Sequence, residues 1–193
     1  MAQGIRQKAQ GEEYQIYKPY SSKSVVRYFG KDNENMVGII SYGAYVPLLR
    51  LGPETSGWNL PVEKAVANWD EDSLTMAVAA AMDCLVDMDR SRIDGLYFAS
   101  TTSPYSEKLA ATTAAWATDL GRNILTADFT DSLRSGTTAL RMASDTVKAG
   151  SAGRVLMTAS DLRIGDPREG LDKTLGDGAA TLVVRFINIF TIY

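Results

Sequence analysis

The sequence predicts an α/β fold in which helices cover a mixed, mostly parallel sheet. Apolar, β-rich runs alternate with stretches of helical periodicity from Met36 onward, in the order β-α-β-α-β-α-β-β. The chain has 193 residues, of which 45% are apolar and 22% charged, and this composition is sufficient for one hydrophobic core. Strands that alternate with helices form parallel sheets, because each helix returns the chain to the start of the next strand.

The first strand and helix are expected between residues 36 and 88. Residues 36–47 (MVGIISYGAYVP) form a β-rich run that ends at a proline, and residues 50–70 are expected to be a loop. Asp72 or Ser73 can cap a helix that ends near Met88. Its apolar positions recur at helical spacing: Leu74, Val78, Ala81, Met82 and Leu85.

Two further strand–helix units follow, and then two strands. Strands are expected at residues 95–100, 124–129, 154–160 and 179–186, with a polar loop over 161–176. One helix should end at Gly121, and four of its residues should lie on one face: Leu109, Thr113, Trp116 and Leu120. The other helix, over residues 137–149, should end at Gly150 and turn these side chains inward: Leu140, Ala143 and Val147.

The segments on either side of this domain have a different composition. Residues 1–35 are polar, show no sustained helical or strand periodicity, and are interpreted as an N-terminal extension to a domain over 36–186. Residues 187–193 complete an uncharged apolar tail. Such a tail either packs on another surface or results from a truncated or frame-shifted sequence.

Composition excludes several classes of function. The net charge is −3 and basic residues form no block, which argues against nucleic acid as a partner. With no His and one Cys, the chain cannot build a zinc site of the usual kind, a Ser-His-Asp triad or an internal disulfide. No run approaches the roughly 20 apolar residues of a membrane span, and the N-terminus lacks the apolar core of a secretory signal, so a cytoplasmic protein is expected. Cys84 is interpreted as a small buried hydrophobe.

Two short segments are candidates for a binding site. Residues 128–138 run from a strand into a helix N-terminus, which suits an anion or a developing oxyanion; the alternative is an ordinary junction with Asp131 or Ser132 as N-cap. Gly176, Asp177 and Gly178 permit a sharp turn and the close approach of a ligand or of another backbone. Because this turn precedes a strand, it is not a phosphate-binding loop.

The order of elements, together with TADFTDSLRSGTTAL and LGDGAATLVV, resembles the N-terminal half of the thiolase superfamily. Within that superfamily the resemblance is to 3-hydroxy-3-methylglutaryl-CoA (HMG-CoA) synthases of archaeal type and to type III ketoacyl synthases. It extends over residues 36–186, and implies a thiolase-like half-domain whose ligand is a coenzyme A thioester, with no covalently bound cofactor and no metal.

The resemblance also implies that catalytic residues are replaced. The segment TTSPYSEK matches a family motif that begins with the catalytic Glu, and places Thr101 at that position. The family's acyl-accepting Cys lies in the pattern Ala-Asp-Leu-x-x-Ala-Cys-x-x-Gly-Thr, which places Leu133 at the nucleophile position. A second half supplies a His and an Asn or second His in the family, whereas this sequence has no His. The residues expected to contact the ligand around this vestigial site are Ser132, Arg134, Gly136, Gly176, Asp177 and Gly178.

Three functions follow from these observations. The first is a non-catalytic subunit that pairs with a catalytic thiolase-like chain or forms a homo-oligomer. The second is a fragment of an active acyl-CoA condensing or thiolytic acyltransferase, with residues 134–136 as the oxyanion site. The third is a CoA-binding α/β module in which Arg134, Arg163 and Arg168 face phosphates.

Overall fold

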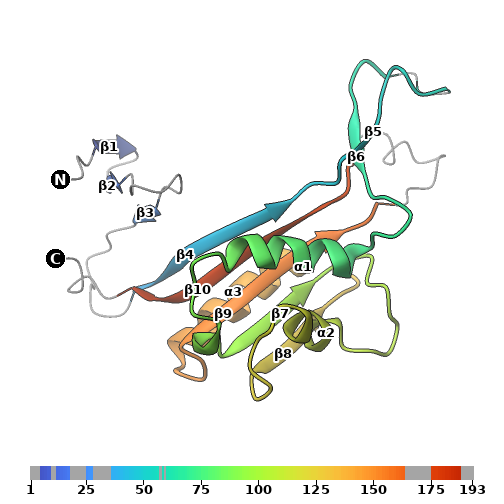
Figure 1. Ribbon diagram of the computed structural model, residues 1–193. Coiled ribbons are helices and arrows are strands. Elements are labelled where there is room, and N and C mark those ends of the chain that lie inside the picture. Colours follow the sequence, from blue (N-terminus) through green and yellow to red (C-terminus); the bar gives the residue numbers. More distant parts are fainter. Residues whose placement is uncertain are drawn as a thin grey trace.

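The computed structural model describes residues 5–9, 12–17, 25–27, 36–56, 58, 60–163 and 175–187. Its main feature is a five-stranded sheet with the order β4-β10-β9-β7-β8 (Figure 1). The strands are β4 (Met36–Tyr45), β7 (Gly95–Ala99), β8 (Leu125–Phe129), β9 (Arg154–Asp161) and β10 (Gly178–Ile187). All five lie within two residues of the predicted bounds, so the alternation of apolar runs located the sheet correctly.

The sheet is mixed, as predicted. Strand β7 pairs in parallel with β8 and with β9, whereas β10 pairs antiparallel with both β9 and β4. Strands β4, β7, β8 and β9 therefore run in one direction, and β10 runs against them. The predicted α/β class with a mostly parallel sheet is confirmed.

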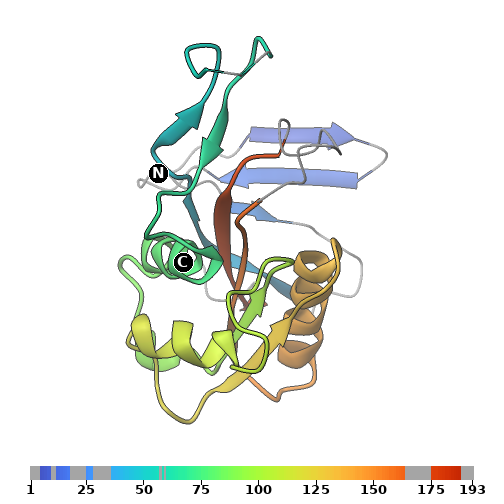
Figure 2. The ribbon, with the colours of Figure 1, turned by 90° about the vertical axis from the view of Figure 1, so that its right-hand side faces the viewer.

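Helices cover both faces of this sheet. Helices α1 (Ser73–Cys84) and α2 (Ala110–Ala117) pack on one face and α3 (Ser135–Lys148) packs on the other (Figure 2). Because successive strand residues point to opposite faces, Leu96 and Phe98 of β7 belong to the core under α1 and α2, and Tyr97 and Ala99 belong to the core under α3.

Helix α1 is strongly anchored at its start. The Asp72 carboxylate accepts a hydrogen bond from the Thr75 N–H, and the Thr75 hydroxyl accepts one from the Asp72 N–H, each at 2.7 Å. The helix ends at Cys84 instead of the predicted Met88, and Asp87 adopts a left-handed conformation with φ of 62°. Cys84 is completely buried, as interpreted.

The face predicted for the helix at α2 is correct for Leu120, which is 9% exposed and belongs to the core, but wrong for Leu109 and Trp116. Trp116 is 69% exposed, and the buried side chains of the helix are alanines: Ala110, Ala111, Ala114 and Ala115. These small residues pack directly against the sheet, whereas the large side chains of Leu109 and Trp116 are exposed. The helix also stops before Gly121, because Asp119, with φ of 57°, already takes the left-handed conformation expected of that glycine.

Several short elements were not predicted. At the predicted loop over residues 50–70, β5 (Leu49–Leu51) and β6 (Lys64–Val66) form a two-stranded antiparallel sheet. After α1, η1 (Arg90–Arg92) is a single 3₁₀ turn. Strands β1 (Ile5–Ala9), β2 (Glu12–Tyr17) and β3 (Val25–Arg27) form a separate antiparallel sheet in the segment interpreted as lacking strand periodicity. Of the predicted tail, Ile187 ends β10 and residues 188–193 lie outside the described residues.

Across the described ranges, each helix is too short to cross a bilayer.

Candidate functional site

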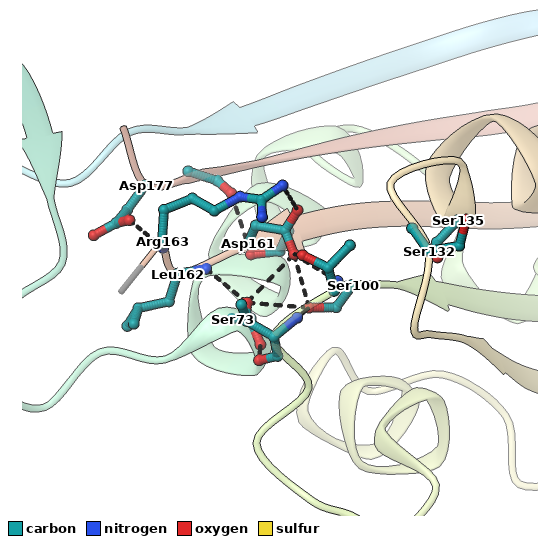
Figure 3. Close-up of polar contacts among 12 residues, drawn as sticks. Ser73, Ser100, Ser132, Ser135, Asp161, Leu162, Arg163 and Asp177 are labelled. Atoms are coloured by element: carbon teal, nitrogen blue, oxygen red, sulfur yellow. Dashed lines mark hydrogen bonds and ion pairs between the residues drawn. The ribbon is translucent and has the colours of Figure 1, made fainter. Parts of the chain in front are cut away.

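A group of polar residues lies where β7 and β9 end side by side. The Asp161 Oδ1 atom accepts hydrogen bonds from the Thr101 N–H at 2.6 Å, from the Thr101 hydroxyl at 3.0 Å and from the Ser100 and Thr102 hydroxyls at 3.2 and 3.3 Å. Its Oδ2 atom forms an ion pair with Arg163 at 3.5 Å. We call Ser100, Thr101, Thr102, Asp161 and Arg163 the Asp161 cluster (Figure 3).

The Asp161 cluster is tied to α1 and to the chain after β9. The Ser73 hydroxyl, at the start of α1, donates to the Thr102 carbonyl at 2.7 Å. The Leu162 N–H donates to the Thr102 hydroxyl at 2.9 Å. The side chains of Asp161 and Arg163 remain 30% and 26% exposed, so the cluster is reachable from solvent while its geometry is constrained.

Asp177 binds backbone amides on two other segments. Its carboxylate accepts from the Arg163 N–H at 2.5 Å and from the Ala67 N–H at 2.7 Å, and the residue is 7% exposed. A Cβ atom on Gly176 would lie 3.3 Å from the Ala65 nitrogen and oxygen, and one on Gly178 would lie 3.2 Å from the Tyr45 oxygen. The close neighbours of this turn in the structure are thus the backbones of β6 and β4.

An open pocket of about 350 Å³ lies beside the turn. Asp161 and Arg163 line it together with Leu175, Gly176, Asp177 and residues of β9 and β10: Ala159, Ser160, Gly178, Ala179 and Ala180. Across the described ranges, no three His, Cys, Asp or Glu side chains gather in a way that would hold a metal ion.

The junction between β8 and α3 forms a second group of predicted site residues. Ser132 organises it: its hydroxyl accepts from the Arg134 N–H at 3.2 Å, and its carbonyl accepts from the Ser135 N–H at 2.9 Å and the Ser135 hydroxyl at 2.6 Å. The N-cap residue of α3 is Arg134, without a side-chain cap, so the prediction of Asp131 or Ser132 is wrong. An extra turn from Ser132 to Ser135 precedes the helix, so α3 begins at Ser135. Asp131, just before this turn, has a left-handed conformation with φ of 63°.

Leu133 stands at the tip of this junction. Its side chain is 82% exposed, and the neighbouring Asp131, Ser132 and Arg134 are exposed as well. A Cβ atom on Gly136 would lie 3.6 Å from the Ala159 side chain, an ordinary packing distance. The junction therefore presents an apolar side chain at the position where the sequence pattern places a nucleophile.

The structure divides the predicted site residues between these two groups. Thr101 belongs to the Asp161 cluster and Asp177 adjoins it through Arg163, whereas Ser132 lies apart from the cluster in Figure 3. Arg163 pairs with Asp161, and Arg168 lies outside the described residues. Sequence reasoning missed Ser100, Thr102 and Asp161, although each follows or ends a predicted strand and the carboxyl ends of parallel strands are where α/β sheets bind ligands.

Curated proteins with similar sequences are HMG-CoA synthases. The chain is 35% identical over 156 residues to the enzyme of Pyrococcus horikoshii, which corresponds to 77% of this chain and 45% of that protein. It is 32% identical over 168 residues to the enzyme of Methanocaldococcus jannaschii, covering 80% of this chain and 49% of that protein. The chain thus spans about half the length of the curated relatives it matches. No family model matches it.

Solved structures with the same fold include condensing enzymes. The β-ketoacyl-[acyl carrier protein] synthase III of Thermus thermophilus superposes with a TM-score of 0.68 at 23% identity, over 79% of this chain and 52% of that one. A Xanthomonas campestris OleA variant with a Cys-to-Ser replacement, solved with bound lauric acid and lauroyl-CoA, gives 0.66 at 15% identity, over 78% and 56%. The sequence similarity and the fold together make the chain a thiolase-like α/β half-domain. Its sequence is HMG-CoA synthase-like.

Proposed function

We propose that the chain is a non-catalytic thiolase-like subunit, which contributes to an acyl-CoA site beside a catalytically competent condensing or thiolytic chain. The observation that supports this proposal most strongly is Leu133, an 82% exposed leucine at the tip of the β8–α3 junction. A leucine side chain has no lone pair with which to attack a thioester, so covalent acyl transfer needs a nucleophile from elsewhere.

The other positions of the vestigial site support the same proposal. Thr101 has no carboxyl group, and its hydroxyl already donates to Asp161. An active fragment would use the backbone amides of residues 134–136 as its oxyanion site. Two of these three amides, those of Arg134 and Ser135, donate instead to Ser132. The sequence has no His to act as a general base near neutral pH.

Binding of an acyl-CoA does not require the missing nucleophile. The OleA variant of the same fold holds lauroyl-CoA although one of its cysteines is replaced by serine. We accordingly place an acyl-CoA thioester among the ligands of the assembly. We also place the assembly in the cytoplasm, because a single buried Cys suits a reducing compartment.

Purification from the native source tests the proposed role. A tagged chain is isolated, and intact-mass spectrometry is applied to it and to its partners. We expect a chain of about 21.0 kDa together with a thiolase-like chain that contains Cys and His. A roughly doubled mass, with Cys and His in the same polypeptide, would contradict the subunit role and favour a fragment of an active enzyme.

One observation favours a second candidate function, that of a catalytic half. The Asp161 carboxylate lies one hydrogen bond from Thr101, the position of the family's catalytic Glu, and can accept a proton there. In a purified assembly, Asp161→Asn would then lower kcat by about 100-fold or more with little change in KM. Unchanged kcat would exclude this role.

A further inference from the structure

Three arginines gather at the end of the sheet opposite to the Asp161 cluster. Arg154 begins β9 and is paired in register with Arg185 of β10. Residues directly opposite each other in an antiparallel pair project to the same face, with Cβ atoms about 5 Å apart. Arg92 belongs to the neighbouring turn η1, and the Asp94 N–H, two residues further on, donates to the Arg154 carbonyl at 2.9 Å.

These charges are not neutralised by ion pairs within the described part of the chain. The ion pairs found there join Arg50 to Glu63, Asp145 to both Arg141 and Lys148, and Arg163 to Asp161. On the other side of Arg185, the residue in register on β4 is Gly38, which offers no side chain.

The two carboxylates closest in sequence to the arginines have other partners. Asp94 accepts from the Gly153 and Arg154 amides at 2.8 and 2.9 Å, and Asp89 accepts from the Ser91 amide and hydroxyl at 3.1 and 2.6 Å. The pKa of the Arg154 guanidinium is lowered from its ordinary value by burial, and then by repulsion from Arg92 and Arg185, more than these carboxylates raise it. Like charges directly opposite in a sheet are destabilising, and Asp89 and Asp94 offset the repulsion at Arg154 only in part.

We propose that Arg92, Arg154 and Arg185 form a binding site for a phosphate group carried by a small anionic ligand. A guanidinium is a planar fork of N–H donors that matches phosphate oxygens. The Arg185 Nε–H donates to the Phe186 carbonyl at 2.8 Å, which leaves the two terminal nitrogens of that side chain for a phosphate. Because two of the forks start from directly opposite residues, both can reach a single tetrahedral anion. The site is independent of the proposed subunit role, since it lies at the amino ends of β7 and β9, whereas the Asp161 cluster lies at their carboxyl ends.

Pyrophosphate is the probe for this site, and thermal unfolding of the full chain at low, matched ionic strength is the measurement. At a concentration about 100 times its Kd, pyrophosphate should raise the Tm by about 5 to 10 °C. Arg154→Gln and Arg185→Gln should each lose most of this shift. Arg141→Gln is the matched control, because Arg141 lies on α3 with an 85% exposed side chain and should retain it.

The variants without ligand provide a second measurement. Arg154→Gln should unfold at the same temperature as the parent chain or higher, since it removes repulsion, whereas a structural arginine would lower the Tm when replaced. Absence of a saturable shift in the parent chain would overturn the proposal, as would a shift that persists in both variants. Stabilisation by poly-L-glutamate without stabilisation by pyrophosphate would overturn it too, in favour of an acidic protein partner.

Titration with adenosine 3′,5′-bisphosphate identifies the source of the phosphate. Tighter binding than pyrophosphate, lost in the same two variants, would support a nucleotide-borne phosphate. Equal or weaker binding with the same loss would support recognition of the phosphate alone.

Discussion

Asp161 accepts hydrogen bonds from both the backbone N–H and the hydroxyl of Thr101, at 2.6 and 3.0 Å. This pairing places a carboxylate beside Thr101, the position at which the matching family motif has a Glu. It also joins the ends of β7 and β9, since Ser100 and Thr102 donate to the same oxygen atom.

Removal of this carboxylate should destabilise the fold. Asp161→Ala leaves the Thr101 amide and three hydroxyls without their acceptor, and we expect a loss of about 2 kcal/mol in the free energy of unfolding, limited by partial exposure. Chemical denaturation measures the loss. Glu107→Ala, at an exposed position of the following loop, is the control and should change stability by less than about 0.5 kcal/mol. Equal stability of the two variants would show that the cluster is not structural.

Restoration of the nucleophile should not restore catalysis. Leu133→Cys introduces a thiol at an exposed position, but no His of the chain can accept its proton. With radiolabelled acetyl-CoA, we expect no acetyl-enzyme with rapid turnover from this variant alone. Leu133→Ser controls for non-specific labelling, and rapid turnover by the cysteine variant would refute a non-catalytic role.

Two glycines should respond to alanine in opposite ways. A Cβ atom on Gly43 of β4 would overlap the Ala80 carbonyl and the Cys84 nitrogen of α1, so Gly43→Ala should cost about 3 kcal/mol. Gly136→Ala should stabilise α3 by about 0.5–1 kcal/mol, because its nearest neighbour beyond the helix lies at 3.6 Å. Both values come from denaturant titration. Similar effects at the two positions would contradict the close packing of β4 on α1.

The contact between Tyr45 and Glu71 predicts a pH dependence of stability. The Tyr45 hydroxyl donates to the Glu71 carboxylate, and this hydrogen bond, followed by burial and nearby negative charge, raises the pKa of Tyr45 above its ordinary value of 10.0. A raised pKa in the folded state means that the contribution is complete below pH 10 and is lost as the pH rises through the folded pKa. The stability difference between the parent chain and Tyr45→Phe should therefore shrink in strongly alkaline solution. A difference that is constant from pH 8 to 11 would argue against this contact.

The sheet was predictable because its strands are short apolar runs separated by helices. The inner face of α2 was not, because four alanines pack on the sheet and their burial leaves no large-residue periodicity. The start of α3 was also misplaced, since both Asp131 and Ser132 are good capping residues and the decisive contact is the turn from Ser132 to Ser135.

The site was predictable only where a motif marks it. Thr101 and Leu133 occupy motif positions, and the sequence identifies them. Asp161 can be recognised as a site residue only when β9 is known to pair with β7, and these two segments are about 60 residues apart in the sequence. The juxtaposition of the two positively charged residues Arg154 and Arg185 likewise depends on the register of β9 and β10, which composition does not reveal.

The position of β10 has a consequence for synthesis of the chain. This strand is the last of the sheet to be made, yet it lies between β4 and β9 and provides the described pairing partner of β4. On the ribosome, β4 must wait for more than a hundred further residues before its hydrogen-bonding edge is occupied. During that interval a ten-residue strand without charges is open to other nascent chains, and a chaperone that shields it until residue 187 emerges would favour correct folding.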